Sequence, residues 1–262
     1  MCLSNVMAIA NACIELGYWP SHFKIFLTIT IPKPNKVSYN LSKSFKPIII
    51  LNTLGKLIEK VISNRMQFYV IANNFIHQSQ LGDLKFKSMT DADIVLTYFI
   101  YMGWVKNMST SILAFNILQF FPSFNYHLLS LILKKVGFDL HVIHFFFNYL
   151  VNRKTHYVWN NFSLHFVNVN VGVGQGLALS PILSALYLSP FLHILEKCLK
   201  NLNLQISLLS FVDNGLLITQ SKSFKTSNSQ LFCSYSIAVN LLTKFSLSVE
   251  HSKTKVFHFL RL

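Results

Sequence analysis

The stretch from Val171 to Leu195 constrains the fold more than any other part of the sequence, because it runs for 25 residues without Asp, Glu, Lys or Arg. A segment this apolar either crosses a bilayer or is buried inside a folded domain. Three glycines and two prolines interrupt it, and in a membrane they would require a broken helix. We therefore predict a glycine-rich loop followed by a buried helix over 181–199, with a membrane protein as the alternative.

The composition of the 262-residue chain favours a folded domain that meets a polyanion. Hydrophobic residues make up 52%, which is enough for a sizeable core and argues against wholesale disorder. Lys and Arg number 23 against nine Asp and Glu, so the net charge is +14. Such a charge is typical of proteins that bind nucleic acid, or else an anionic membrane surface. The alternative is a codon bias that favours Lys, Phe, Asn and Ile.

The cysteines and the N-terminus indicate a reducing compartment. Cys2, Cys13, Cys198 and Cys233 form no Cys-x-x-Cys pair and have no zinc-like spacing, so free thiols are expected. The first lysine is Lys24, so the basic region of a secretory signal is missing.

Apolar periodicity predicts helices and strands in mixed order, that is, an α+β fold. Glycine at position 137 follows an apolar stripe, where it can end a helix in the left-handed conformation. The predicted helices cover 3–16, 126–136, 140–152, 181–199 and 224–245, and a run over 48–62 becomes helical near its glycine. The predicted strands cover 26–31, 111–116, the region of 157, 166–171, 206–212, 216–219 and 255–260.

A hairpin with an acidic tip is the first candidate for chemistry. Two apolar runs flank Asp213-Asn214-Gly215, whose residues tolerate the positive φ angles that tight turns need. A carboxylate at the tip of a rigid hairpin is well placed to hold Mg²⁺. Taken alone, however, an Asp at a turn is more often structural.

A second sequence pattern makes the candidate chemistry more specific. From Gly172 to Leu183 the sequence has the pattern Gly-x-x-Gln-Gly-x-x-x-Ser-Pro-x-Leu. This pattern and four further segments resemble, in order, the motifs of reverse transcriptases from LINE-type non-LTR retrotransposons. The residues in these motifs are most similar to those of fungal elements of the Tad clade. These segments are 44–60 (the fingers motif), 114–123 (motif A), 211–214 (motif C) and 250–255 (motif D).

The resemblance implies a right-hand polymerase fold with fingers, a palm whose antiparallel sheet is packed with helices, and a largely absent thumb. It places the N-terminal segment and fingers at 1–105, and the palm at 106–262 with a fingers-type insertion near 125–165. It also places Asp91 and Asp93 in the fingers, away from the catalytic residues.

The resemblance further implies two Mg²⁺ ions held by three carboxylates, one in motif A and a pair in motif C. This sequence has Asn116 at the motif A position, and Asp213 followed by Asn214 at the motif C pair. Asp213 is thus the one remaining family carboxylate, and Asp213 with Asn116 would form the metal site. Asparagine keeps one carbonyl oxygen but loses the charge, so we expect impaired catalysis.

Further roles follow from the same resemblance. Lys253 matches the motif D lysine, a general acid for the leaving pyrophosphate. Phe121 matches the steric gate against a ribose 2′-hydroxyl, with ordinary core packing as the alternative. The remaining nucleotide-binding positions are Lys33, Lys46, Gln175 and Gly176. For each lysine the alternative is a solvated surface charge.

The expected function is therefore template-directed DNA synthesis on RNA, with an RNA template, a DNA primer and a deoxynucleoside triphosphate as partners. A non-catalytic, nucleic-acid-binding retroelement remnant is the alternative. In either case no membrane partner is expected, and the chain would act inside the cell, in a nuclear or cytoplasmic ribonucleoprotein.

Overall fold

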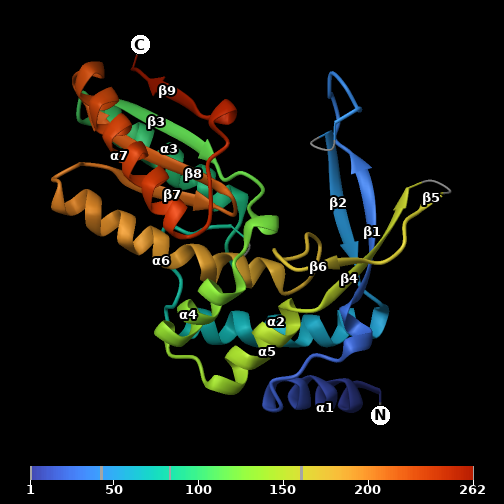
Figure 1. Ribbon diagram of the computed structural model, residues 1–262. Helices are drawn as coiled ribbons and strands as arrows, with labels where there is room; N and C mark the ends of the chain where they lie inside the picture. The colour runs from blue at the N-terminus through green and yellow to red at the C-terminus, as the bar shows by residue number, and fades with distance from the viewer. Residues whose placement is uncertain (1, 42–43, 83, 160–161, 262) are drawn as a thin grey trace. The chain divides into compact units, whose positions relative to one another are not determined.

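The computed structural model describes residues 2–41, 44–82, 84–159 and 162–261 (Figure 1). The chain divides into two compact units, and each is assembled from two separate stretches of sequence. The first unit comprises Met1–Phe68 and Phe121–Ser180, and the second comprises Tyr69–Phe120 and Pro181–Leu262.

The first unit contains a five-stranded sheet in the order β2-β1-β4-β5, with β6 paired to β4. Strands β1 and β2 are antiparallel, whereas β1 and β4 are parallel. The strands are β1 (Ile25–Pro32), β2 (Phe45–Ile50), β4 (Arg153–Trp159), β5 (Phe162–Ser163) and β6 (Val167–Val169). The helical segments are α1 (Cys2–Glu15), η1 (Ser21–Lys24), α2 (Thr53–Ala72, which continues into the second unit), η3 (Phe121–Ser123), α4 (Tyr126–Val136) and α5 (Leu140–Leu150).

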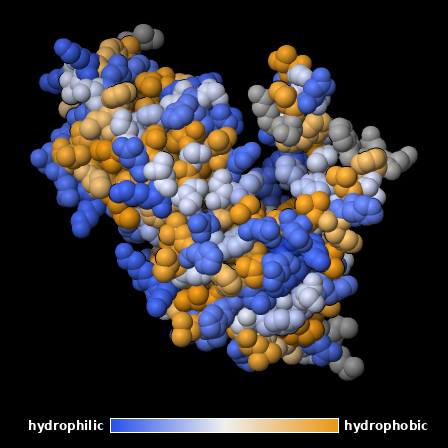
Figure 2. Space-filling model, viewed as in Figure 1, coloured by the Kyte–Doolittle hydropathy of each residue, from blue (hydrophilic) through white to orange (hydrophobic). Residues whose placement is uncertain are grey.

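The inward face of β1 differs from what its composition suggests. Thr28 is buried and shares a hydrogen bond with Thr155 of β4 at 2.5 Å, while Ile29 and Ile31 are exposed. Figure 2 shows hydrophobic side chains among hydrophilic ones over β1 and β2. The hydroxyl pair lets threonine point inward at little cost, because both polar groups are satisfied.

The second unit is built on a four-stranded antiparallel sheet in the order β7-β8-β3-β9 (Figure 1). Its strands are β3 (Ser109–Asn116), β7 (Ser207–Phe211), β8 (Asn214–Ser221) and β9 (Lys255–Phe259). Its helical segments are α3 (Met89–Val105), α6 (Ser180–Asn201, which starts at the last residue of the first unit), α7 (Phe224–Lys244) and η4 (His251–Lys253).

Helix α3 is the main element that periodicity does not reveal. It begins with a capping box, in which the Ser88 hydroxyl accepts from the Asp91 N–H and the Asp91 carboxylate accepts from the Ser88 N–H. Its apolar residues surround the helix, so no clear stripe marks it in the sequence. Ala92 packs in a core cluster with Ile112 of β3 and Ile218 of β8.

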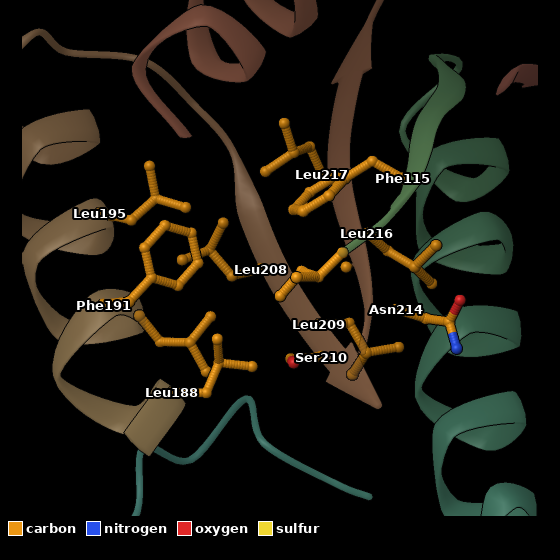
Figure 3. Close-up of a pocket in the computed structure, with 13 residues that line it drawn as sticks. Phe115, Leu188, Phe191, Leu195, Leu208, Leu209, Ser210, Asn214, Leu216 and Leu217 are labelled. Carbon is orange, nitrogen blue, oxygen red and sulfur yellow. The ribbon is translucent and has the colours of Figure 1, made fainter. Parts of the chain in front are cut away.

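Helix α6 confirms the buried helix predicted after the glycine-rich loop. Leu188, Phe191 and Leu195 point from it toward Leu208, Phe115 and Leu217 of the sheet, around a small cavity (Figure 3). By length and composition it could cross a membrane, but 67% of its apolar window is buried inside the protein. That is the pattern of a core helix.

Helix α4 covers the residues that its apolar stripe predicts. Asn125 caps its start by accepting from the Leu128 N–H, and Gly137 ends it in the left-handed conformation at φ 100°. Both features follow from local sequence, since short polar residues favour N-caps and glycine favours the position after a helix.

Candidate functional site

The tip of the β7–β8 hairpin differs from the predicted turn. Phe211 pairs with Asn214, so the connecting residues are Val212 and Asp213, and Asn214 and Gly215 already belong to β8. The positive φ therefore falls on Val212, at 56°, and not on the Asp-Asn-Gly sequence. A β-branched residue in this conformation is strained, at a cost of about 1–3 kcal/mol. The surrounding structure must impose it.

The segment 79–82 imposes this turn. The Ser210 N–H donates to the Ser79 carbonyl at 2.8 Å, and the Leu81 N–H donates to the Ser210 carbonyl at 2.8 Å. Directly beside the turn lies Gly82, where a Cβ atom would be only 2.4 Å from the Val212 nitrogen. Only glycine fits there. We did not predict this segment, and its isolated glycine was the one local sign of a close backbone approach.

Asn116 lies at the end of β3, directly opposite Asn214 of β8. Its side-chain N–H group donates to Asp213 Oδ2 at 3.1 Å and to Asn214 Oδ1 at 3.0 Å. Asn214 in turn donates to Asp213 Oδ1 at 3.1 Å. The three residues that the resemblance matches to the family's catalytic acids therefore meet at adjacent strand ends, and together we call them the Asn-Asp-Asn cluster.

The donor set of this cluster does not fit a pair of magnesium ions. Both carboxylate oxygens of Asp213 accept hydrogen bonds from amide groups, so a metal ion would have to share them with these donors. Magnesium in proteins is held by carboxylate oxygens and dehydrates reluctantly. The cluster offers one charge where two divalent ions need several. Among the residues that the structure describes, no group of three or more His, Cys, Asp and Glu is arranged to hold a metal.

A cavity of about 630 Å³ opens beside the cluster, within the second unit. Asn116 and Asn214 line it, and so does Lys253 from η4. In Figure 3, Asn214 points away from α6. The predicted motif D lysine therefore shares one cavity with the two asparagines.

The cavity also contains residues that sequence reasoning did not place there. Asp93 of α3 and Lys255 of β9 line its wall. The resemblance places Asp93 away from the catalytic residues, but α3 packs on the same sheet as Asn116 and brings this acid to the cavity. Asp91 instead caps the helix, and the Ser88 hydroxyl and N–H hold the pKa of its carboxyl below the usual value. Asp93 could not be placed at this cavity from the sequence, because helix α3 was not among the predicted elements.

The other predicted residues lie in the first unit. The Gln175 carbonyl accepts from the Ile49 N–H at 3.0 Å, which joins the glycine-rich loop to β2, the strand that carries Lys46. The side chain of Lys46 is exposed, and that of Gln175 is half-buried. Gly176 has a positive φ of 96°. These three positions therefore occupy one region of the first unit.

Phe121 is linked to the start of the same loop. Its carbonyl accepts from the Val173 N–H at 2.7 Å. At Gly172, with φ 78°, a Cβ would meet that carbonyl at 2.8 Å, so glycine is required. The Phe121 ring is half-buried and parallel to Phe124, with centroids 6.5 Å apart. Lys33, just after β1, donates its N–H to the Ser44 carbonyl at 2.8 Å.

Comparison with solved structures shows the fold. Telomerase from Candida tropicalis, as the apo form truncated from its C-terminal domain, superposes with a TM-score of 0.64 at 14% identity, over 90% of this chain and 50% of that one. Telomerase from Candida albicans, in complex with an RNA fragment, gives 0.63 at 13% identity, over 92% and 44%. The chain thus has the polymerase fold of these proteins and spans about half their length.

Comparison with known sequences shows the family. A probable RNA-directed DNA polymerase from transposon BS of Drosophila melanogaster is 30% identical over 74 residues, which are 28% of this chain and 8% of that protein. The family model for reverse transcriptase (RNA-dependent DNA polymerase) matches residues 31–260. With a fold shared with telomerases and a match over most of its length, the chain belongs to the reverse transcriptase family.

Proposed function

We propose that this chain is the reverse transcriptase domain of a LINE-type non-LTR retrotransposon, similar to Tad-clade elements, and that its catalysis of DNA synthesis on RNA is impaired. The observation that carries this proposal is the Asn-Asp-Asn cluster. Its residues meet at adjacent strand ends and, by the motif resemblance, match the family's catalytic acids, but they present one carboxylate in place of three.

Charge is the reason for the impairment. Nucleotidyl transfer in this family uses two metal ions that stabilise the attacking and leaving oxygens. A pair of unit charges at ~4 Å is worth about 4 kcal/mol at an effective dielectric near 20. Each lost carboxylate removes at least that much attraction for a divalent ion. Since 1.4 kcal/mol corresponds to a factor of ten, the rate should fall by roughly three decades or more.

The other family roles are part of the same proposal. In the second unit, Lys253 would act as general acid toward pyrophosphate from the wall of the cavity that Asn116 also lines. In the first unit, Lys46 would face the triphosphate, and Gln175 and Gly176 would contact nucleotide and template. Phe121 would be the steric gate, and Lys33 a further contact to the triphosphate.

The assignment of segments to polymerase subdomains also remains a proposal. We assign 1–105 to the N-terminal segment and fingers, and 106–262 to the palm with a fingers-type insertion near 125–165. The insertion falls within the first compact unit, together with residues 1–68, whereas 69–105 fall within the second. The four-stranded sheet that carries Asn116 and Asp213 is the proposed palm sheet.

A second candidate function is nucleic-acid binding without chemistry, as expected for a retroelement remnant. The net charge of +14 supports it, because binding to phosphates needs cations and not the catalytic acids. Under this proposal the partners are an RNA template with a DNA primer, in an intracellular ribonucleoprotein.

One experiment separates the two candidates. Purified protein is given an RNA template annealed to a DNA primer, with Mg²⁺ and deoxynucleoside triphosphates, and both primer binding and extension are measured. Binding with no detectable extension, together with some synthesis once Asn116 and Asn214 are both replaced by aspartate, supports the impaired polymerase. Binding without extension in either protein supports the remnant. If the protein neither binds nor extends at low salt, both proposals are wrong.

A further inference from the structure

The glycine-rich loop from Gly172 to Ser180 is held at both ends by charged side chains that are completely buried. Arg153 contacts its first residue and Glu59 contacts its end, and both side chains are 0% exposed. All of these residues belong to the first unit. Buried charges are costly unless they are paired or hydrogen-bonded. Arg153 Nη1 and Glu59 Oε2 have no hydrogen-bond partner among the described residues, so the partners of their other atoms indicate what these side chains hold.

Arg153 holds the start of the loop. Its Nη2 group donates to the Gly172 carbonyl, to the Val171 carbonyl at 3.3 Å and to the Tyr126 hydroxyl at 2.6 Å. Its Nε group donates to the Leu150 carbonyl at 2.9 Å. One planar guanidinium thus connects the end of α5 and the start of α4 with the first residue of the loop, which a lysine ammonium has no geometry to do.

The surroundings of Arg153 contain aromatic rings where a carboxylate would be expected. Its guanidinium carbon lies 6.0 Å from the ring centroid of Phe26 and 5.6 Å from that of Tyr126. In the described part of the chain, no Asp or Glu forms an ion pair with it. An apolar residue would fill this space without the cost of burying a charge, so the carbonyls at the start of the loop are what the guanidinium stabilises.

Glu59 of α2 holds the end of the loop. Its carboxylate accepts from the Leu179 N–H at 3.3 Å and from the Tyr149 hydroxyl. One turn later on the same helix, the Ser63 hydroxyl donates to the Ala178 carbonyl at 2.7 Å. Burial raises the pKa of the Glu59 carboxyl above its ordinary value. The carboxyl group thus lies at a buried position that disfavours its charged form. At this position it binds the backbone N–H at the end of the loop.

Between these ends the loop is fixed by further hydrogen bonds. The Ser180 hydroxyl donates to the Gly174 carbonyl at 2.6 Å, and the Ile49 N–H donates to the Gln175 carbonyl at 3.0 Å. The loop therefore has a defined backbone path before any ligand arrives.

We propose that Arg153 and Glu59 are positioning residues that clamp this loop and thereby hold Gln175 and Gly176 in place for the incoming nucleotide and the template. The clamp itself follows from the contacts above, and the ligand it serves rests on the proposed function. A preorganised loop binds its ligand without a separate ordering cost, which is the advantage that offsets two buried charges.

Hydrogen exchange of the full chain tests the clamp directly. The variant Arg153→Met should speed exchange at the Val173 and Leu179 amides about tenfold or more, which corresponds to 1.4 kcal/mol, while α4 stays protected. The matched control is Arg65→Met, because Arg65 is an exposed arginine of α2 that contacts only Asn11 in the described structure. It should leave the loop unchanged.

Conservative variants separate positioning from a general structural role. Arg153→Lys keeps the charge but not the planar fork, so it should recover thermal stability without recovering loop protection. Glu59→Gln keeps an acceptor for the Leu179 N–H and should keep protection, whereas Glu59→Leu should lose it. Unchanged loop exchange in Arg153→Met, or equally faster exchange throughout the first unit, would overturn the proposal.

Adding ligand distinguishes a failed clamp from a failed function. An RNA template annealed to a DNA primer, with the complementary deoxynucleoside triphosphate, should protect the Gln175 and Gly176 amides further, and Arg153→Met should reduce that gain about tenfold. If the unchanged chain shows no added protection, the proposed function and the ligand-holding role fail together, while the clamp is judged by the exchange without ligand.

Discussion

Replacing Asn116 and Asn214 together by aspartate is expected to turn a self-satisfied hydrogen-bond cluster into a site that needs cations. In the structure, the Asn116 amide nitrogen lies 3.1 Å from Asp213 Oδ2 and 3.0 Å from Asn214 Oδ1. The double variant places carboxylate oxygens at about these separations. Two like charges at ~3.1 Å repel by about 5 kcal/mol at a dielectric near 20, and by about 1 kcal/mol in water.

Exposure decides which of these values applies. Asn214 is exposed, while Asn116 and Asp213 are half-buried, so the repulsion lies nearer the lower value. The three carboxylates of the double variant form three repelling pairs at about 1 kcal/mol each. Without divalent ions we therefore expect it to lose roughly 2–4 kcal/mol of stability, which is about 4–16 °C in Tm for a domain of this size. Magnesium should restore much of that loss in the double variant and have little effect on the unchanged chain.

The assay combines thermal unfolding, with and without MgCl₂, and primer extension on an RNA template. The unchanged chain should extend no primer detectably, and the double variant should show some magnesium-dependent synthesis. Each single variant, Asn116→Asp or Asn214→Asp, should do little, because residues of a two-metal site act as a unit.

Two results would refute this reasoning. If the unchanged chain polymerises as fast as its double variant, the asparagines are not lesions. If magnesium raises the Tm of the unchanged chain as much as that of the double variant, Asp213 binds the ion without the two added charges, and the missing charges are not what weakens the site.

Three further predictions follow from the fold and the charge. A basic chain that binds phosphates releases counterions, so log affinity for template-primer should fall linearly with log salt. In a filter-binding titration, Lys46→Gln should reduce the slope of that line by about one. An affinity that does not change with salt would rule out phosphate binding. The pKa of Glu59 is raised in the folded chain, so its contribution to stability is fully present below the unfolded pKa and is lost as pH rises through the folded pKa. Urea unfolding should therefore show stability falling from about pH 4.3 upward. The variant Glu59→Gln does not titrate and should flatten this fall. Gly82→Ala should cost about 1–3 kcal/mol in the same unfolding assay, since its Cβ would lie 2.4 Å from the Val212 nitrogen; a neutral effect would show that the turn moves freely.

Local elements were predictable where neighbours along the chain decide the conformation. The helix over Tyr126–Val136 has a 3.6-residue stripe, a capping Asn125 and a terminal Gly137, and the structure has the same bounds. The apolar run after Ser180 was predictable from its lack of charged residues, and it forms a buried helix. Helix α3 has no stripe, because its residues are apolar all round, so periodicity does not reveal it, and only the capping residues Ser88 and Asp91 mark its start.

The turn at the candidate site shows how tertiary structure overrides local preference. Asp213-Asn214-Gly215 has the composition of a turn, but β3 and β7 continue the sheet through Asn214 and Gly215. The bend moves to Val212, which adopts a conformation that its own side chain disfavours. Sheet register and the close approach of Gly82 decide this, and neither is a property of the turn residues.

The sequence by itself determined the family, the order of the motifs and the identity of the candidate site residues, because these depend on residue type and spacing along the chain. Only the tertiary structure decided which residues meet. It joined Asn116 to Asp213 across 97 positions, brought Asp93 to the same cavity, and set Arg153 and Glu59 at the two ends of one loop. Such contacts depend on sheet register and helix packing, which are set by the burial of the whole core and leave no periodic trace in the local sequence.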